Sequence, residues 1–180
     1  AAEQLREVGI KLSIALLEPE GKNTAPALTM AALAATELGE DPILVVTPSD
    51  HDIASQATFT SALHDAIREA SKGAISILGV KPDAPETGYG YIKAQPVSEE
   101  VALRVTKFIE KPNLNAAKSY LTEDCYYWNA GMVMVKASVW LNAINLFRTD
   151  IANSCMNAWS KRSIDSNYET LFIRPSAEDF

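Results

Sequence analysis

The stretch ILVVT at residues 43–47, followed by PSDHD at residues 48–52, decides the fold. The first five residues are apolar or β-branched and show no polar alternation, which predicts a short strand covered on both faces. The proline, serine and aspartates that follow are typical of a turn. We therefore expect a buried strand with a polar loop at its carboxyl end.

The segments on both sides of this strand alternate between strand and helix. Apolar residues at helical spacing predict a helix over 53–72 that ends at Gly73, and a second helix is expected over 24–38. Apolar runs at 11–17 and 74–80 predict two further buried strands. Three strands joined by helices of this length imply parallel pairing with right-handed crossovers.

The second half of the chain changes character. Strands over 89–95 and 101–108 are expected to pair antiparallel. The other expected elements are a short helix over 113–121 capped by Asn113, a strand over 126–135 broken by Gly131, and helices over 137–147 and 151–160. The sequence thus predicts an α/β fold with a mixed, mainly parallel sheet and flanking helices, in a single domain spanning 1–180.

Composition and charge narrow the function classes. The chain has 180 residues, of which 47% are hydrophobic and 22% charged, and its formal net charge is −7. This acidity argues against a nucleic-acid partner or an anionic membrane surface, since both need a clustered basic face. It does not exclude an anionic substrate, because a few lysines and arginines can line a pocket. No apolar run approaches the ~20 residues needed to cross a bilayer, and residues 1–6 resemble part of a helix more than a signal peptide.

Cys125 and Cys155 are the only cysteines, with no CxxC pair and no histidine at ligand spacing. A zinc site is therefore not expected, and two free thiols in a reducing compartment are the default interpretation. These features together predict a soluble cytoplasmic protein. Its oligomeric state stays open, with a homo-oligomer as one alternative.

Two polar segments follow expected strands, where ligands bind in open sheets. In EPEGKNTAP at 18–26, Lys22 and the start of the next helix could bind an anion; the alternative is a loop with an ordinary helix cap at Asn23 or Thr24. In PSDHD, Asp50 could hold Mg²⁺ or simply form the turn.

Two further segments carry groups suited to a sugar. Gly88 and Gly90 in TGYGYI permit close backbone approach and Tyr89 could flank a sugar face, although a tight turn explains the pattern equally well. In FIEKP, Glu110 offers acceptors for sugar hydroxyls and Lys111 offers a cation for a phosphate. An exposed ion pair is the alternative there. The segment WNAGM adds the amide of Asn129, and its tryptophan, Trp128, and its methionine, Met132, are expected in the core.

Taken in order, five segments resemble motifs of the nucleotide-sugar pyrophosphorylases, and specifically of the bacterial mannose-1-phosphate guanylyltransferases. They are EPEGKNTAPA, PSDHDI, TGYGYI, FIEKP and WNAGM, and they cover nearly the whole chain. The resemblance implies a Rossmann-like nucleotidyltransferase (GT-A-like) sheet. It also implies Mg²⁺ as cofactor and transfer of a guanylyl group from GTP to mannose-1-phosphate, giving GDP-mannose and pyrophosphate.

The same resemblance assigns roles to individual residues. Asp50 matches the metal-binding aspartate, Gly88 a backbone contact to the sugar, and Asn129 a sugar-contacting amide. Glu110 matches the carboxylate that binds mannose hydroxyls and Lys111 the cation for the sugar phosphate, so Asp50 and Lys111 are the catalytic candidates. Lys22 and Asn23 fall on the nucleotide-side motif and Tyr89 on the sugar-side motif. Lys22 replaces an arginine of the family, which loses the planar guanidinium.

Two family elements are missing from the sequence. The glycine-rich signature that wraps the triphosphate is expected before residue 1, and a second metal aspartate lies in an SIDYAVME segment of the family. Asp165 follows SI here, but the continuation differs and the spacing is too short, so we do not equate the two. The chain is therefore expected to be an internal fragment. Alternatives are a non-catalytic sugar-phosphate-binding module and a pyrophosphorylase with another base or sugar.

Overall fold

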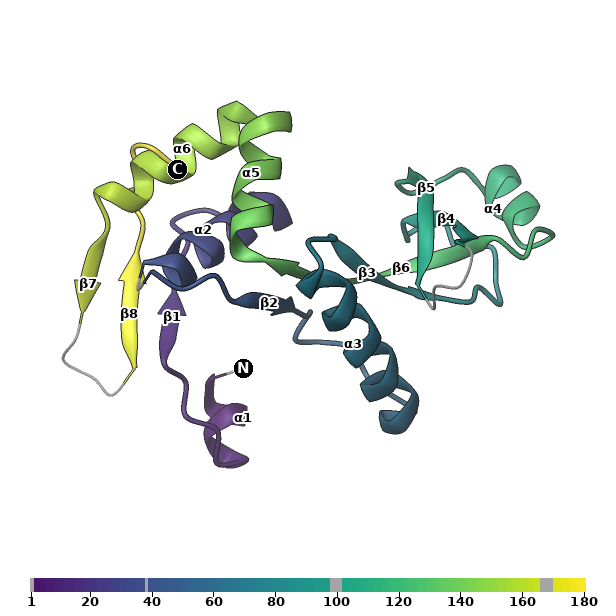
Figure 1. Cartoon of the computed structure of the whole chain (residues 1–180), viewed down its shortest axis with the longest axis horizontal. Helices are drawn as coiled ribbons and strands as arrows, with labels where there is room; N and C mark the ends of the chain where they lie inside the picture. Colours follow the sequence, from purple (N-terminus) through teal and green to yellow (C-terminus); the bar gives the residue numbers. More distant parts are fainter. Residues whose placement is uncertain (1, 38, 98–101, 166–169) are drawn as a thin grey trace. The chain divides into compact units, whose positions relative to one another are not determined.

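A computed structural model describes residues 2–37, 39–97, 102–165 and 170–180 (Figure 1). Contacts within the chain divide it into two compact units. The first unit comprises residues 1–44 and 136–180, and the second comprises residues 45–135. This division does not test the prediction of a single domain, which stays a prediction.

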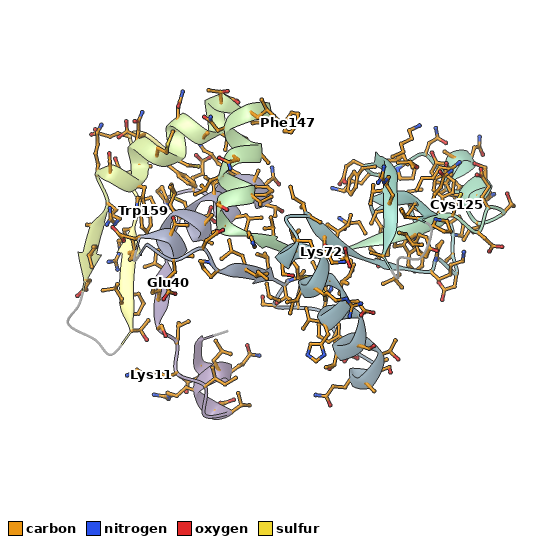
Figure 2. The ribbon with its side chains drawn as sticks, in the orientation of Figure 1. Lys11, Glu40, Lys72, Cys125, Phe147 and Trp159 are labelled. Atoms are coloured by element: carbon orange, nitrogen blue, oxygen red, sulfur yellow. The ribbon has the colours of Figure 1, made fainter. Side chains whose placement is uncertain are left out.

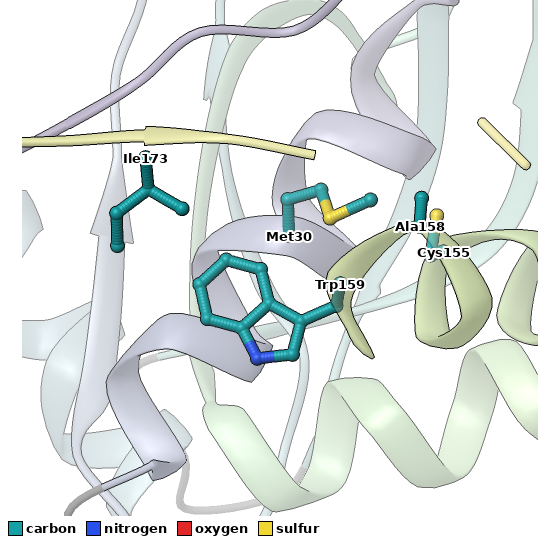
Figure 3. Packing of buried hydrophobic residues seen from close by; sticks show 5 residues of the cluster. All are labelled: Met30, Cys155, Ala158, Trp159 and Ile173. Atoms are coloured by element: carbon teal, nitrogen blue, oxygen red, sulfur yellow. The ribbon is translucent and has the colours of Figure 1, made fainter. Parts of the chain in front are cut away.

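The first unit packs three helices beside a small sheet. Its elements are α1 (Ala2–Glu7), β1 (Ile14–Leu16), α2 (Thr24–Thr36), α5 (Ala137–Phe147), α6 (Thr149–Ser160), β7 (Ser163–Asp165) and β8 (Leu171–Arg174). The strands run in the order β1-β8-β7, with β1 parallel and β7 antiparallel to β8. Helices α2, α5 and α6 contact one another, and Figure 3 shows the core beneath them. That core contains Met30, Cys155, Ala158, Trp159 and Ile173.

The second unit contains the larger sheet. Its elements are β2 (Ile43–Val46), α3 (Gln56–Ser71), β3 (Ser76–Val80), β4 (Tyr91–Pro96), β5 (Leu103–Ile109), α4 (Leu114–Tyr120) and β6 (Tyr126–Lys136), and β2 and β6 reach across the unit boundary. The strand order is β2-β6-β4-β5, and β3 also pairs with β6. Helix α3 lies along β3 (Figure 1).

Strand register assigns the side chains of this sheet to two faces. Ile92 pairs with Phe108 and Tyr127, so these three side chains share one face. Tyr91 pairs with Ile109 and Trp128, which lie on the other face. On that second face a small core of Tyr91, Ala117 and Tyr126 packs against α4.

The predicted α/β class with a mixed sheet and flanking helices is confirmed, and so is the antiparallel pairing of β4 with β5. The prediction that the first three strands pair parallel with one another is wrong, because each of them pairs with a later strand. Strand β1 pairs parallel with β8, whereas β3 pairs antiparallel with β6. An apolar run indicates burial of a strand but does not identify its neighbour, and the 11 residues of β6 offer β3 a long partner.

Strands β2 and β3, which were expected to be buried, are also less completely covered than predicted. Val45 in β2 is 44% exposed and Val80 in β3 is 49% exposed. Periodicity alone therefore overestimated how far these strands are covered.

Helix and strand ends follow local capping chemistry. Helix α3 starts at Gln56, three residues later than predicted, because the Ser55 side chain accepts from the Thr58 amide and provides the cap. The predicted cap at Asn113 is confirmed by a 2.9 Å bond from the Ala116 amide to Oδ1. The weakly patterned end of the chain contains β7 and β8.

Both thiols are free, with Cys155 buried and Cys125 half-buried just before β6 (Figure 2). Within the described ranges, no helix is long and apolar enough to cross a membrane.

Candidate active site

Three strands of the second unit bring Gly90, Glu110 and Asn129 together. Gly90 directly precedes β4 and Glu110 directly follows β5, and antiparallel pairing of Tyr91 with Ile109 places these two ends side by side. From β6, the backbone amide of Asn129 donates a 2.8 Å hydrogen bond to the Gly90 carbonyl. Three segments that are far apart in sequence, each selected by its motif, therefore meet at one end of the sheet.

Gly90 makes this arrangement possible because it has no side chain. A Cβ added there would lie 3.0 Å from Phe108 Cζ and 3.1 Å from Glu110 Oε2, so close that these two groups would have to move by a few tenths of an ångström. The Glu110 carboxylate and the Phe108 ring therefore rest directly over the backbone of Gly90. Sequence reasoning noted both glycines of TGYGYI but chose Gly88, where an added Cβ would meet nothing within 4 Å. The sugar contact of Gly88 stays a prediction.

Glu110 and Lys111 form a loose, exposed pair. Their charged atoms are 3.7 Å apart, and the side chains are 62% and 66% exposed, respectively. A pair this exposed contributes little to stability, so both groups are available to a ligand. Lys111 also has a φ of 43°, a left-handed conformation that costs a residue with a side chain about 1–2 kcal/mol. Such strained residues cluster at functional sites.

Asn129 lies in an irregular part of β6. Gly79 pairs with Asn129 while Ile77 pairs with Val133, so β6 contains extra residues between these two points. Gly131, within the bulge, has a φ of 67° and donates a 3.2 Å hydrogen bond from its amide to Asn129 Oδ1. A Cβ on Gly131 would stand 3.5 Å from Pro48 Cγ. The bulge therefore contacts the turn that carries Asp50.

Asp50 lies exposed in that turn. Among the residues the structure describes, no partner for its carboxylate is found, and no group of three or more potential metal ligands occurs. Mg²⁺ in nucleotide sites usually binds one or two carboxylates, with substrate phosphates and water completing its coordination. A carboxylate that has no partner among the described residues, on a turn beside the β6 bulge, fits that coordination.

Tyr89 lies on the opposite face of the sheet from Glu110. Its ring meets the edge of Trp128 with centroids 5.3 Å apart, and Trp128 shares a face with Tyr91. Trp128 is half-buried against the α4 core, and its indole N–H is buried without an acceptor in the described structure. Met132 is 4% exposed, as expected of a core residue. The sugar contact predicted for Tyr89 stays a prediction.

Lys22 and Asn23 belong to the first unit, at the start of α2. Lys22 Nζ donates a 2.8 Å hydrogen bond to the carbonyl of Phe180 and lies 3.6 Å from a carboxylate oxygen of Glu20. Asn23 has a φ of 67° and makes no side-chain capping bond. In the same unit, Asp165 ends β7 and pairs with Phe172.

A hollow of about 540 Å³ lies between α3 and the sheet of the second unit. Ile92, Ala94, Val105 and Tyr127 contribute to its lining, but Gly90, Glu110 and Asn129 do not. Ile92, which lines the hollow, pairs with Phe108, so the hollow lies on the same face of the sheet as the Phe108 side chain. Much of the lining of the hollow is apolar, and the arginine that it contains, Arg104, pairs with Gln95 at the opposite end of β4 from Gly90. We therefore place the site not in the hollow but at the triad of Gly90, Glu110 and Asn129.

A family model described as nucleotidyl transferase matches residues 1–171. The chain belongs to the nucleotidyl transferase family. Among relatives of this nucleotidyl transferase, the xanthan biosynthesis protein XanB of Xanthomonas campestris is 47% identical over 171 residues, covering 95% of this chain and 36% of the relative. A mannose-1-phosphate guanylyltransferase of Escherichia coli is 41% identical over 185 residues, covering 99% of this chain and 38% of the relative.

A solved structure supports the same fold for this nucleotidyl transferase. The crystal structure of mannose-6-phosphate isomerase from Helicobacter pylori is 33% identical, with a TM-score of 0.88, and the match covers 99% of this chain and 67% of that one. The chain spans little more than a third of the curated relatives it matches, at 36% and 38% of their lengths.

Proposed function

We propose that this chain is the sugar-phosphate-binding part of a mannose-1-phosphate guanylyltransferase, which transfers a guanylyl group from GTP to mannose-1-phosphate. The observation that carries the proposal is the meeting of Gly90, Glu110 and Asn129 at one end of the sheet. The names of the relatives in Xanthomonas and Escherichia support the choice of sugar and pathway. We place the reaction in the cytoplasm, a reducing compartment in which the free thiols of Cys125 and Cys155 are expected.

The sugar side of the site has a defined set of interactions. Glu110 accepts hydrogen bonds from mannose hydroxyls, and Asn129 contacts the same sugar through its amide. Lys111, next to Glu110, balances the charge of the sugar phosphate and keeps its oxygen directed at the α-phosphate of GTP. A reaction of this kind needs positioning and charge neutralisation more than a covalent nucleophile. Gly88 and Tyr89 lie on the loop next to this sugar.

The nucleotide side is assigned to Asp50, Lys22 and Asn23. Asp50 is the candidate ligand of Mg²⁺, which neutralises charge on the triphosphate when bound. Lys22, whose side chain is 44% exposed, supplies a cation for phosphate oxygens.

The test is a Glu110→Gln substitution in the full-length protein that contains this chain. Glutamine keeps the size of the side chain but loses the charge and half of its acceptors. We expect the KM for mannose-1-phosphate to rise about 10-fold or more, since a hydrogen bond to a charged group contributes about 1.5–3 kcal/mol, with the Kd for GTP unchanged. Glu123→Gln is the matched control. Glu123 forms an ion pair with Lys93, with 2.9 Å between their charged atoms, and it is not part of the triad. Unchanged GDP-mannose synthesis by Glu110→Gln would remove the assigned role.

A second candidate is a sugar-phosphate-binding module that does not catalyse transfer. It is favoured by the fact that the sugar-side residues all lie in the second unit, whereas Lys22 and Asn23 belong to the first. Calorimetry of this chain with mannose-1-phosphate and with GTP separates the two functions. Assays of the full-length protein with UTP and dTTP test the base, and a preference for either would reject the guanylyl assignment.

A further inference from the structure

The bulge in β6 determines which end of the Asn129 amide faces a ligand. A backbone amide can only donate, so the atom of Asn129 that receives the 3.2 Å bond from Gly131 must be the carbonyl oxygen Oδ1. The remaining polar atom, Nδ2, carries two hydrogens, and no acceptor for them is found among the residues that the structure describes. The orientation of the side-chain amide therefore follows from the chemistry of its neighbour.

Gly131 can make this bond because of its backbone conformation. Its φ of 67° is left-handed, which costs a residue with a Cβ about 1–2 kcal/mol and glycine almost nothing. Pro48 stands behind it at 3.5 Å from the position of an added Cβ. An alanine there favours a different backbone angle, which turns the Gly131 amide away from Asn129.

We propose that Gly131 is a positioning residue that presents Asn129 to the sugar as a hydrogen-bond donor, complementary to the acceptor Glu110. Both residues adjoin Gly90, since the backbone amide of Asn129 donates to the Gly90 carbonyl and the Glu110 carboxylate lies over the Gly90 Cα. A sugar hydroxyl facing Asn129 then accepts, and a hydroxyl facing Glu110 donates. The pair therefore binds two hydroxyls in opposite hydrogen-bonding roles, since a hydroxyl can either donate or accept. This inference rests on the proposed function for the identity of the ligand.

The decisive variant is Asn129→Asp in this chain. Aspartate has the same shape and still accepts from the Gly131 amide, but it has no hydrogen to donate. We expect the thermal midpoint to stay within about 2 °C of the wild type, while calorimetry with mannose-1-phosphate shows at least a 10-fold weaker Kd. Equal affinity of Asn129→Asp and wild type would overturn the donor assignment.

The positioning role is tested by Gly131→Ala and Gly131→Asn. Asparagine adopts left-handed angles more readily than alanine, so we expect Gly131→Ala to weaken mannose-1-phosphate binding 5-fold or more and Gly131→Asn to restore part of the loss. Gly73→Ala is the matched control, because Gly73 also has a positive φ, of 97°, and lies at the end of α3 with open space around it. It should lower the thermal midpoint without changing affinity. Equal losses of affinity in Gly73→Ala and Gly131→Ala would show a general effect of strain and reject the role.

Hydrogen exchange separates this inference from the proposed function. In the ligand-free chain, the Gly131 amide should exchange slowly, and Asn129→Ala should speed its exchange about 10-fold because Oδ1 is removed. If the wild type fails to bind mannose-1-phosphate but this exchange difference is found, the proposed function fails and the amide orientation holds. If the wild type binds and the exchange rate does not change, the orientation alone is wrong.

Discussion

Replacing Gly90 by alanine tests whether the backbone of Gly90 supports Glu110. The new Cβ would approach Phe108 Cζ to 3.0 Å and Glu110 Oε2 to 3.1 Å, so both groups must move by a few tenths of an ångström. The Phe108 ring is 49% exposed and the Glu110 side chain is 62% exposed, so both can turn toward solvent. The cost in folding free energy is therefore small, about 1 kcal/mol or less, which corresponds to a fall of about 2–4 °C in Tm.

Binding should be affected much more strongly than stability. A displaced carboxylate loses most of a charge-assisted hydrogen bond, about 1.5–3 kcal/mol, so we expect mannose-1-phosphate to bind roughly 10- to 100-fold more weakly by calorimetry. The double variant Gly90→Ala, Phe108→Leu removes the ring contact and leaves only the carboxylate contact. It should bind as weakly as Gly90→Ala. Wild-type affinity in Gly90→Ala, or full recovery in the double variant, would refute the idea that Gly90 positions Glu110.

Three further predictions concern the first and second units separately. Hydrogen bonds from the backbone and side chain of the serine at the start of α5 hold the pKa of Asp41 below its usual value. The Tm difference between wild type and Asp41→Ala should therefore be complete above about pH 4 and shrink as the pH falls through the lowered pKa. Equal Tm differences at pH 3 and pH 7 would contradict this. Burial, and to a smaller extent the charge of a nearby glutamate, raises the pKa of Cys155 to about 11. A thiol reagent at pH 8 should therefore modify Cys125 and leave Cys155 intact until the protein unfolds. Peptide mass mapping of the modified cysteines checks this. Thr29→Val removes the hydroxyl that accepts a 3.0 Å hydrogen bond from the Trp140 indole N–H. It should lower the free energy of unfolding, measured with denaturant, by about 1–3 kcal/mol. An unchanged unfolding midpoint would show that water replaces the hydroxyl.

Much of the site could be predicted because its residues are in motifs at strand ends. Glu110 and Asn129 were selected from FIEKP and WNAGM, and the structure brings both to Gly90. The choice between Gly88 and Gly90 could not be made from the sequence. It depends on the register of β4 against β5, which shifts at Lys93 in a way that no local pattern indicates.

The strand pairings were harder to predict for a similar reason. Apolar runs located β1, β2 and β3 but did not show that β3 pairs with β6 or that β1 pairs with β8. Strands β7 and β8 have only 3 and 4 residues, so little of their pattern can be detected. Their pairing depends on contact with β1, more than a hundred residues earlier in the chain.

The central claim is that Gly90, Glu110 and Asn129 form a sugar-phosphate site. An NMR titration of the ¹⁵N-labelled chain with mannose-1-phosphate tests it most directly. We expect the largest shifts on the backbone amides of Gly90, Lys111 and Gly131 and on the Asn129 side-chain NH₂. Glu110→Gln should abolish these shifts at the same concentration. Shifts confined to the first unit, or an unchanged titration in Glu110→Gln, would contradict it.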